Sequence, residues 1–358
     1  MSRILIITQK VDRTDDVLGF FHLWLEEFAT QFQEVSVICL YRGDYALPEN
    51  VSVYSLGKEK LEKGTYGMFE VLWQRIKYVT LFYRLIWQQR TKYDYVFVHM
   101  NSEYVIFGAP LWKIFGKRII LWYNHTYGTL RTKVAMSLSN AVCHTSEFSF
   151  TAGTKKSHLM SAGIATDVFK KDHTIRKKPH SLLYVGRISA VKNVDVLLRA
   201  FNLLIQKKVE CTLDIYGDPG PGDQLYFESI KGLALPYERD GLITFHGKIP
   251  NSLTPAVYNA HQVLVNLTPR GNFDKTVLEA MSTETVVAVS SPAFASLLPL
   301  ECRFKERDDE DLAQVLNKLL MLPEYHYTDL GRTFRNSVVQ KHDLKKLVKD
   351  ISVLFAQI

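Results

Sequence analysis

The sequence predicts an α/β protein made of two doubly wound, Rossmann-like domains. Short apolar segments rich in Val, Ile and Tyr alternate with helical patterns along the 358-residue chain. Most of these segments are too apolar to have one wet face, which indicates parallel strands covered on both sides. The chain is also too long for one ordinary core, so we expect two sheets that face each other across a cleft.

The first half of the chain alternates expected strands with expected helices. The strands fit at 3–9, 35–41, 51–56, 93–100, 118–125, 141–146 and 157–162, and the helices near 17–33, 68–91, 103–115 and 130–139. This alternation defines an N-terminal domain over residues 1–168. The segment 169–180 is polar, strongly charged and ends near a proline, so we interpret it as the linker.

The second half repeats the pattern. Its strands fit at 181–187, 211–218, 243–247, 262–268 and 286–290, and its helices near 194–207, 223–235, 253–260, 275–283, 308–322 and 343–357. We assign residues 181–340 to a C-terminal domain. The last helix, within 341–358, is expected to pack back towards the N-terminal domain.

The composition is that of a globular protein with a modest positive charge. Hydrophobic residues make up 47% of the chain and charged residues 23%, and the formal net charge is +7. Such basicity suits nucleic acid, anionic lipid or an anionic small substrate. The sequence holds no helix-turn-helix, zinc-finger or aromatic RNA-binding pattern, so we expect no nucleic-acid partner.

The cysteines and the apolar runs predict a cytoplasmic location. The four cysteines are scattered without a C-x-x-C pair, which argues against disulfides or a zinc site and for a reducing compartment. The apolar start at residues 4–7 is too short for a signal-peptide core, and no apolar run approaches the ~20 residues of a transmembrane helix.

Two cations follow the expected strand at 181–187. Gly186 allows a sharp turn at the strand end, and Arg187 then offers a planar fork that can bind phosphate oxygens. Lys192 adds a point charge near the start of the next helix, where backbone amides also favour an anion. The pair suits a diphosphate, although each residue taken alone is equally compatible with a solvated side chain.

Glu279 is an acid within the apolar helical stretch 277–281. An unpaired buried carboxylate is costly, so this side chain needs a partner. The two hydroxyls of a ribose ring would satisfy it. An ion pair within the protein is the alternative.

Several short patterns occur in order in the second half and together resemble one family. They are Gly186-Arg187-x4-Lys192, Gly217-Asp218, Phe245-His246-Gly247 and Val277-Leu278-Glu279-Ala280-Met281. The order resembles the C-terminal domain of retaining glycosyltransferases of family 4 (glycosyl transferases group 1), which have the GT-B fold. The resemblance covers about residues 181–325 well and the first half more loosely. It implies that Gly186, Arg187 and Lys192 bind the diphosphate of a nucleotide-sugar donor and that Glu279 binds its ribose.

The sequence departs from the family at one position. Eight residues before Glu279 the family usually has a glutamate that contacts the transferred sugar, whereas this chain has Gly271. The following Asp274-Lys275 pair resembles a variant of this donor-binding loop. We expect Asp274 to bond the sugar hydroxyls and to act as a catalytic residue, with Lys275 assisting at the diphosphate. A plain N-cap role for Asp274 is the alternative.

Two positions in the first half also resemble the family. His125 ends an expected strand and matches the catalytic histidine near the sugar and the reaction centre. An ordinary hydrogen-bonded loop histidine is the alternative. Gly19 lies where similar enzymes have a glycine-rich donor-binding loop, but here it follows a polar stretch with Asp15-Asp16 that could equally be a capped loop.

The expected helix at 68–91 is basic and aromatic. Apolar residues occupy more than one face, and there is no acid between Glu70 and Asp94. Such a helix can lie on an anionic membrane, here the inner face of the cytoplasmic membrane, where a lipid-linked acceptor would be met. A helix buried between neighbours is the alternative.

The resemblance implies a metal-independent, retaining hexosyltransferase without a cofactor. The N-terminal domain would bind a glycan or lipid-linked acceptor, and the C-terminal domain would bind the nucleoside-diphosphate sugar. Gly271 motivates a second hypothesis, a nucleotide-sugar-binding homologue that has lost transfer and serves as a partner or regulatory subunit. A sugar-phosphate phosphorylase is a weaker third interpretation.

Overall fold

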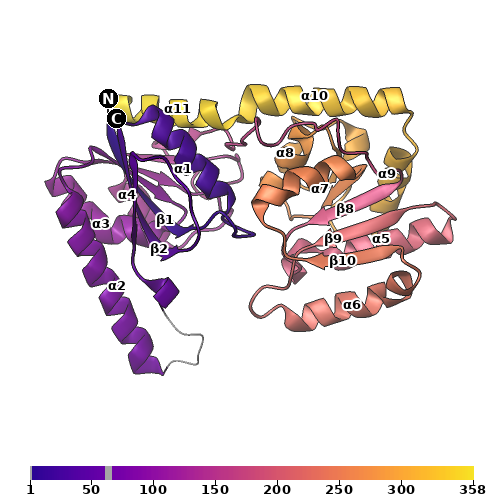
Figure 1. Cartoon of the computed structure of the whole chain (residues 1–358), viewed down its shortest axis with the longest axis horizontal. Coiled ribbons are helices and arrows are strands. Elements are labelled where there is room, and N and C mark those ends of the chain that lie inside the picture. The colour runs from indigo at the N-terminus through magenta and orange to yellow at the C-terminus, as the bar shows by residue number, and fades with distance from the viewer. Residues whose placement is uncertain (1, 61–66) are drawn as a thin grey trace. The chain divides into compact units, whose positions relative to one another are not determined.

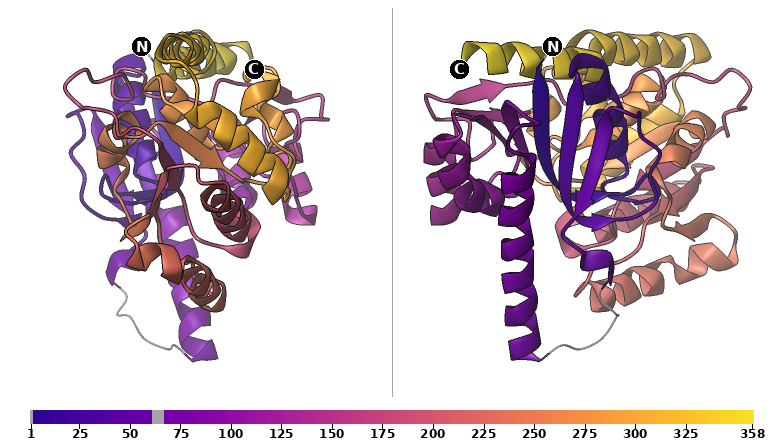
Figure 2. Two further views of the ribbon diagram at one scale, coloured as in Figure 1. Left: turned by 90° about the vertical axis from the view of Figure 1, so that its right-hand side faces the viewer. Right: turned by 60° about the vertical axis from the view of Figure 1, so that its left-hand side comes forward.

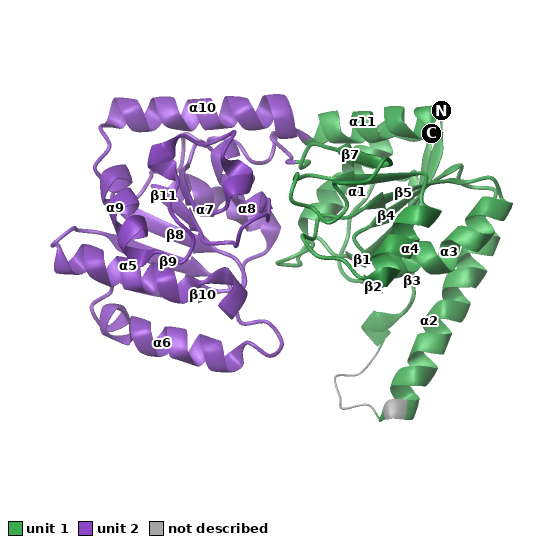
Figure 3. Cartoon of the chain, turned by 180° about the vertical axis from the view of Figure 1, so that it is seen from behind, with its two compact units in different colours: residues 1–163, 344–358 green, residues 164–343 purple. Residues whose placement is uncertain are grey.

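The computed structural model describes residues 2–60 and 67–358, which form an α/β protein with two parallel sheets (Figure 1). The chain divides into two compact units, coloured separately in Figure 3. Unit 1 consists of Met1–Gly163 and Leu344–Ile358, and unit 2 consists of Ile164–Asp343. Each unit has its own sheet and core, and the predicted α/β class with two Rossmann-like units is confirmed.

Unit 1 contains a seven-stranded sheet in the order β3-β2-β1-β4-β5-β6-β7, in which every neighbouring pair is parallel. The strands are β1 (Arg3–Val11), β2 (Glu34–Arg42), β3 (Val51–Ser55), β4 (Tyr95–His99), β5 (Arg118–Trp122), β6 (Ala141–His144) and β7 (Ser157–Leu159). The helices are α1 (Phe20–Gln31), α2 (Met68–Gln89), α3 (Ser102–Ile114), α4 (Leu130–Leu138) and α11 (Leu344–Gln357).

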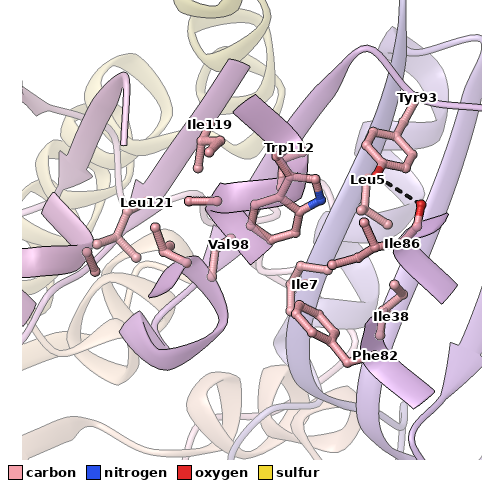
Figure 4. Close-up of a cluster of buried hydrophobic side chains, with 14 of the residues drawn as sticks. Leu5, Ile7, Ile38, Phe82, Ile86, Tyr93, Val98, Trp112, Ile119 and Leu121 are labelled. Carbon is pink, nitrogen blue, oxygen red and sulfur yellow. Dashed lines mark hydrogen bonds between the residues drawn. The ribbon is translucent and has the colours of Figure 1, made fainter. Parts of the chain in front are cut away.

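Successive side chains of β4 point to opposite faces of this sheet. Val96 and Val98 belong to the buried cluster under α2, α3 and α4, which Figure 4 shows around Trp112. Phe97 points the other way and packs against Phe28 of α1, with ring centroids 5.4 Å apart. A strand buried on both faces explains why the sequence is continuously apolar rather than alternating.

Unit 2 contains a five-stranded parallel sheet in the order β10-β9-β8-β11-β12. The strands are β8 (Ser181–Val185), β9 (Thr212–Tyr216), β10 (Ile243–Gly247), β11 (Val263–Asn266) and β12 (Val286–Val289). The helices are α5 (Val194–Gln206), α6 (Gln224–Arg239), α7 (Thr254–Ala260), α8 (Lys275–Ser282), α9 (Asp309–Leu320) and α10 (Glu324–His342). Figure 2 gives two further views of these elements.

Each expected strand is present, but α10 was missed by the sequence analysis. Polar and charged residues dominate this helix, which obscures its pattern. Its buried positions nevertheless follow helical spacing, as Tyr327, Leu330, Phe334 and Val338 show. Gly331 brings α10 so close to the turn before β12 that an added Cβ would lie 2.6 Å from the Glu284 carbonyl oxygen.

The compact units differ in extent from the expected domains. The first boundary falls after Gly163 rather than after residue 168, and the expected linker at 169–180 lies within unit 2. The last helix, α11, belongs to unit 1, where Phe355 stacks on Tyr95 and its carbonyl accepts a hydrogen bond from Arg118 (3.0 Å). Trp24 also donates to the Gly163 carbonyl at 2.9 Å, which ties the end of the N-terminal segment to α1.

Candidate functional site

The order of strands in unit 2 changes direction beside β8. The chain proceeds from β8 through β9 to β10 on one side, then returns to place β11 and β12 on the other. Such a topological switch point leaves a crevice outside the carboxyl ends of the two central strands, where ligands bind in open α/β sheets. The loops after β8 and β11 carry Arg187, Lys192 and Asp274, so the predicted cationic pair and the Asp-Lys loop lie at this edge of one sheet.

Glycines allow the turns after β8 and β9 to approach each other closely. Gly186 has φ +152° and Gly217 has φ +143°. A Cβ added to Gly217 would lie 1.9 Å from the Gly186 carbonyl oxygen, so no other residue fits there without movement of the backbone. The Gly217 amide also donates to the Gly247 carbonyl at 2.7 Å, which links the turn to the end of β10.

Arg187 extends from this pair of turns into solvent. The Tyr184 hydroxyl donates to the Arg187 carbonyl at 2.9 Å and holds the main chain of the turn. Gly220 lies against the side chain, since a Cβ there would approach the Arg187 Cδ at 2.7 Å. Among the residues that the structure describes, Arg187 has no ion-pair partner, which leaves its guanidinium available to an anion.

Lys192 forms an ion pair that the sequence did not reveal. Its Nζ lies 2.6 Å from Asp274 Oδ2 and 3.0 Å from Thr268 Oγ1. Its side chain is 25% exposed, so the ammonium group is held at the surface of the crevice rather than buried. A lysine has three N–H donors, and these two contacts leave one for a ligand oxygen.

Asp274 is the centre of this cluster and is also the N-cap of α8. One carboxylate oxygen accepts from the Thr276 amide, and the other from Thr268 Oγ1 (2.9 Å) and Asn266 Nδ2 (3.2 Å) as well as from Lys192. Burial alone would raise the pKa of Asp274, but the Lys192 charge and these donors hold it well below its usual range. Asp274 therefore is an N-cap, and its catalytic role stays a prediction. The expected bond to sugar hydroxyls would have to use the lone pairs that these donors leave.

Glu279 is buried on α8, one turn after Lys275. Its carboxylate accepts from the Tyr258 hydroxyl (3.1 Å) and from Asn251 Nδ2 (3.3 Å), and the residue is 4% exposed. Burial raises the pKa of Glu279, and the nearby Lys275 ammonium opposes this increase. Burial likewise lowers the pKa of Lys275 against the attraction of Glu279. Glu279 thus has partners within the protein, while a carboxylate retains further acceptor capacity for a ribose.

Gly271 lies in the turn between β11 and α8 with φ +89°. A glutamate would be strained in this conformation, so the chain cannot simply place the family's usual acid here. The Asn272 amide closes the turn on the Pro269 carbonyl at 3.3 Å. The loop before α8 therefore needs a residue at position 271 that tolerates a left-handed backbone.

In unit 1, His125 follows the carboxyl end of β5. Its ring stacks on Tyr127, with centroids 5.3 Å apart, and meets Tyr123 edge-on at 5.2 Å. Burial lowers the pKa of His125, so the neutral imidazole is favoured at neutral pH. Its catalytic role remains a prediction.

Gly19 is the N-cap of α1 with φ −56°, a conformation open to any residue. The preceding loop is a capped turn, because Asp15 Oδ1 accepts from the amides of Val17 (3.0 Å) and Leu18 (2.6 Å). Lys10 pairs with the other oxygen of Asp15. The loop is therefore capped by Asp15, the backbone gives no special reason for a glycine, and donor binding by Gly19 stays a prediction.

A network of polar contacts around the buried Asp214 was not expected from the sequence. Asp214 of β9 accepts from His246 Nε2 (2.5 Å), His261 Nε2 (2.8 Å) and Lys178 Nζ (3.1 Å). The other ring nitrogen of His261 lies 2.7 Å from the Val257 carbonyl oxygen, so both nitrogens of this buried ring face oxygen atoms. The signal in the sequence that could have indicated this network is the single acidic residue, Asp214, within the apolar strand β9.

This network predicts a pH-dependent contribution to stability. Burial would raise the pKa of Asp214, but its three donors hold it well below the ordinary value. A depressed folded-state pKa stabilises the protein above the unfolded value of about 3.9 and loses that effect as the pH falls below it. We expect Asp214→Asn to lower the free energy of unfolding at pH 7 by about 2–4 kcal/mol, because the substitution removes the carboxylate that contacts the buried His261 and the more exposed His246 and Lys178.

Urea unfolding of the wild type and the variant between pH 7 and pH 3 measures this difference. It should shrink as the pH falls below about 4. Asp240→Asn, at the exposed end of α6, is the control and should change stability little at any pH. A difference of the same size at pH 3 as at pH 7 would contradict the assignment.

The C-terminal part of the chain is similar in sequence to one protein family. Residues 179–321 match the family model described as glycosyl transferases group 1. This segment contains the turns after β8 and β9, the Lys192–Asp274 pair and Glu279. No curated protein matches the chain by sequence.

Solved structures share the fold over the whole chain. The Anabaena protein Alr3699/HepE in complex with UDP and glucose has a TM-score of 0.76 at 15% identity, with 100% of both chains covered. The sucrose-phosphate synthase of Thermosynechococcus elongatus gives 0.76 at 16%, with 99% of this chain and 98% of that chain covered. WaaG, a glycosyltransferase involved in lipopolysaccharide biosynthesis, gives 0.67 at 12%, with 98% and 99% covered. The chain therefore has the fold of GT-B glycosyltransferases, and its C-terminal unit has the sequence pattern of group 1.

Proposed function

We propose that the chain is a retaining glycosyltransferase that moves a hexosyl group from a nucleoside-diphosphate sugar to a glycan or lipid-linked acceptor. The observation that carries the proposal is the pair of cations at the switch point of unit 2, within the segment that matches group 1. Arg187 is exposed without an ion-pair partner among the described residues, and Lys192 is fixed by Asp274 with one donor left. Relatives in fold that bind UDP and glucose, or UDP-glucose, support a donor of this type.

In this proposal the protein acts mainly through charge. Arg187 and Lys192 stabilise the negative charge that develops on the departing diphosphate, so these side chains supply what a divalent cation supplies elsewhere. Glu279 binds the ribose, and the neutral His125 ring of the acceptor-binding unit contacts the sugar. The leaving diphosphate takes the proton of the acceptor hydroxyl, which attacks on the same face and retains the anomeric configuration.

A donor-hydrolysis and transfer assay tests activity separately from binding. The protein is incubated with nucleoside-diphosphate sugars and the release of nucleoside diphosphate is followed, with and without acceptor. Release above the uncatalysed rate supports a working transferase. Tight binding of nucleoside diphosphate without any release would instead favour the inactive homologue that Gly271 suggests.

Charge at the start of α8 should matter for turnover. We expect Asp274→Asn and Lys275→Ala each to lower the rate at least about tenfold, since the first loses the anion that positions Lys192 and the second leaves Glu279 without its cation. Asparagine is an equally good N-cap, so Asp274→Asn should preserve the helix. Asp308→Asn, at the N-cap of α9, is the matched control. Wild-type rates in both variants would remove these residues from the mechanism.

We also propose that α2 contacts an anionic membrane. None of the described helices is long and apolar enough to cross a bilayer. The first turns of α2 nevertheless expose Phe69 (87%), Leu72 (55%) and Trp73 (58%), with cations at Arg75 and Lys77. The exposure of these side chains therefore favours membrane contact over burial for the first turns of α2.

Flotation with liposomes measures this contact. We expect the protein to float with phosphatidylglycerol vesicles at low salt and to remain behind with neutral vesicles. Trp73→Ser combined with Lys77→Glu should abolish flotation, whereas Lys349→Glu on the exposed face of α11 should not. Absence of binding to anionic vesicles at low salt would contradict the proposed contact between α2 and a membrane.

A further inference from the structure

Unit 1 contains a cavity of ≈ 650 Å³ at the carboxyl edge of its sheet. Its floor is formed by Gln9 near the end of β1, Leu40 near the end of β2, Leu56 after β3 and Asn101 after β4. Its walls come from α2, α3 and the start of α4. The volume lies within the range of small-molecule sites, and the position is the switch point of this sheet, where β1 meets β4.

One wall of the cavity is apolar. It includes Val79 and Phe82 of α2 and Ile106 and Phe107 of α3, and Phe107 remains 40% exposed. These side chains offer aliphatic and aromatic surface without hydrogen-bonding groups. A purely hydroxylated sugar would leave that surface unused, whereas a hydrocarbon chain would bury it.

The rim of the cavity is cationic. Arg75 of α2 and Arg131 of α4 both line it and are exposed, and neither has an ion-pair partner among the described residues. Glu103 is the acid at the site. The Nδ2 of Asn101 is buried in the lining without a hydrogen-bond partner in the described structure. These groups fit a ligand with an anionic, oxygen-rich group next to its apolar part.

An apolar track leads into the cavity from the exposed end of α2. Leu72, Ile76 and Val79 follow i, i+4, i+7 spacing and so share one face of the helix. Leu72 and Ile76 are 55% and 46% exposed, and Val79 lines the cavity. The first turns of α2 extend beyond the sheet, as Figure 3 shows. A chain lying along this face would therefore run continuously from the outside of the unit to its switch point.

We propose that this cavity binds an amphiphilic acceptor, a single hydrocarbon chain joined to a phosphate, with the chain along α2 and the phosphate between Arg75 and Arg131. The proposal rests on the proposed transferase function and specifies the class of its acceptor. The phosphate would lie at the rim, and the hydroxyl that accepts the sugar would belong to a group esterified to that phosphate. A soluble oligosaccharide would use the arginines but would gain nothing from the apolar wall.

Calorimetric titration of the full chain with octyl phosphate, hexyl phosphate and inorganic phosphate, below micelle formation, tests the site. Each buried methylene contributes about fourfold in affinity, so octyl phosphate should bind about tenfold or more tightly than hexyl phosphate. Inorganic phosphate should bind far more weakly than either. Equal affinities for the three ligands would show an anion site only and overturn the proposal.

Matched variants locate the site. Arg75→Ala should weaken octyl phosphate binding by about fivefold or more, whereas Lys77→Ala, on the same helix but outside the cavity, should change it by less than about twofold. Val79→Asp should reduce binding at least about tenfold, and its neighbour Thr80→Asp should not. A loss as large for Lys77→Ala as for Arg75→Ala would assign the effect to general charge and contradict the site.

The outcome is independent of whether the transferase proposal holds. Binding of nucleoside diphosphate to unit 2 and release of sugar from the donor do not involve this cavity. If the protein bound octyl phosphate but no sugar donor, the proposed cavity site would be supported and the proposed transferase function would be contradicted. If the protein turned over the donor with a soluble acceptor but did not bind octyl phosphate, the transferase function would be supported and the amphiphilic acceptor would be contradicted.

Discussion

Replacement of Lys192 by alanine is expected to lower the rate of sugar transfer by about 10²–10³-fold. The substitution removes a cation that stabilises the departing diphosphate. A rate loss of about 10²–10³-fold is typical when one such charge-stabilising group is removed. It also leaves the Asp274 carboxylate without its ion-pair partner, so a negative charge would face the diphosphate at the same place. We expect the affinity for nucleoside diphosphate to fall as well, by about tenfold or more. Steady-state kinetics and calorimetric titration measure the two effects.

Lys207→Ala is the matched control for this variant. Lys207 is exposed at the end of α5, outside the cluster around Asp274, and its loss should leave both rate and affinity unchanged. Lys192→Arg should restore part of the affinity but not the full rate, because a planar guanidinium does not fit the contacts of a compact ammonium group. A rate for Lys192→Ala within twofold of the wild type would show that the diphosphate binds elsewhere.

Replacement of Gly217 by alanine is expected to destabilise the protein by about 3 kcal/mol or more. Two costs add, since the backbone has φ +143° and the new Cβ would lie 1.9 Å from the Gly186 carbonyl oxygen. The turns after β8 and β9 would have to separate. Because Gly186 directly precedes Arg187, we also expect weaker binding of nucleoside diphosphate in any protein that still folds.

Gly222→Ala measures the cost of the backbone conformation without the cost of a steric clash. Gly222 has φ +89°, but nothing lies within 4 Å of an added Cβ, so the substitution should cost only about 1–2 kcal/mol. Urea unfolding of both variants measures the difference. If Gly217→Ala were no more destabilising than Gly222→Ala, the close approach of the two turns would not hold in solution.

The fold was predictable because hydrophobic periodicity is a local signal. Parallel strands such as β4 and β8 are buried on both faces and appear in the sequence as short apolar runs between helical patterns. Helix α10 was not predictable in the same way, because few apolar residues, among them Leu330, Phe334 and Val338, mark its buried face between polar neighbours.

The site was predictable in its residues more than in its contacts. Arg187 and Lys192 stand out because charged side chains follow an apolar strand at a ligand-binding edge. The pairing of Lys192 with Asp274 joins residues 82 positions apart and depends on β8 and β11 being neighbours, which periodicity does not reveal. Tyr258 and Asn251, the donors to Glu279, come from another helix and loop and were missed for the same reason.

Binding of nucleoside diphosphate to the Arg187–Lys192 edge is the central claim, and thermal unfolding tests it most directly. UDP, GDP, ADP and their sugars are added in turn to the wild type and to Lys192→Ala. A ligand at 100 times its dissociation constant stabilises the folded protein by ~2.7 kcal/mol, so we predict a clear rise in Tm with one nucleotide in the wild type and a much smaller rise in the variant. No rise with any nucleoside diphosphate, or an equal rise in both proteins, would contradict the account.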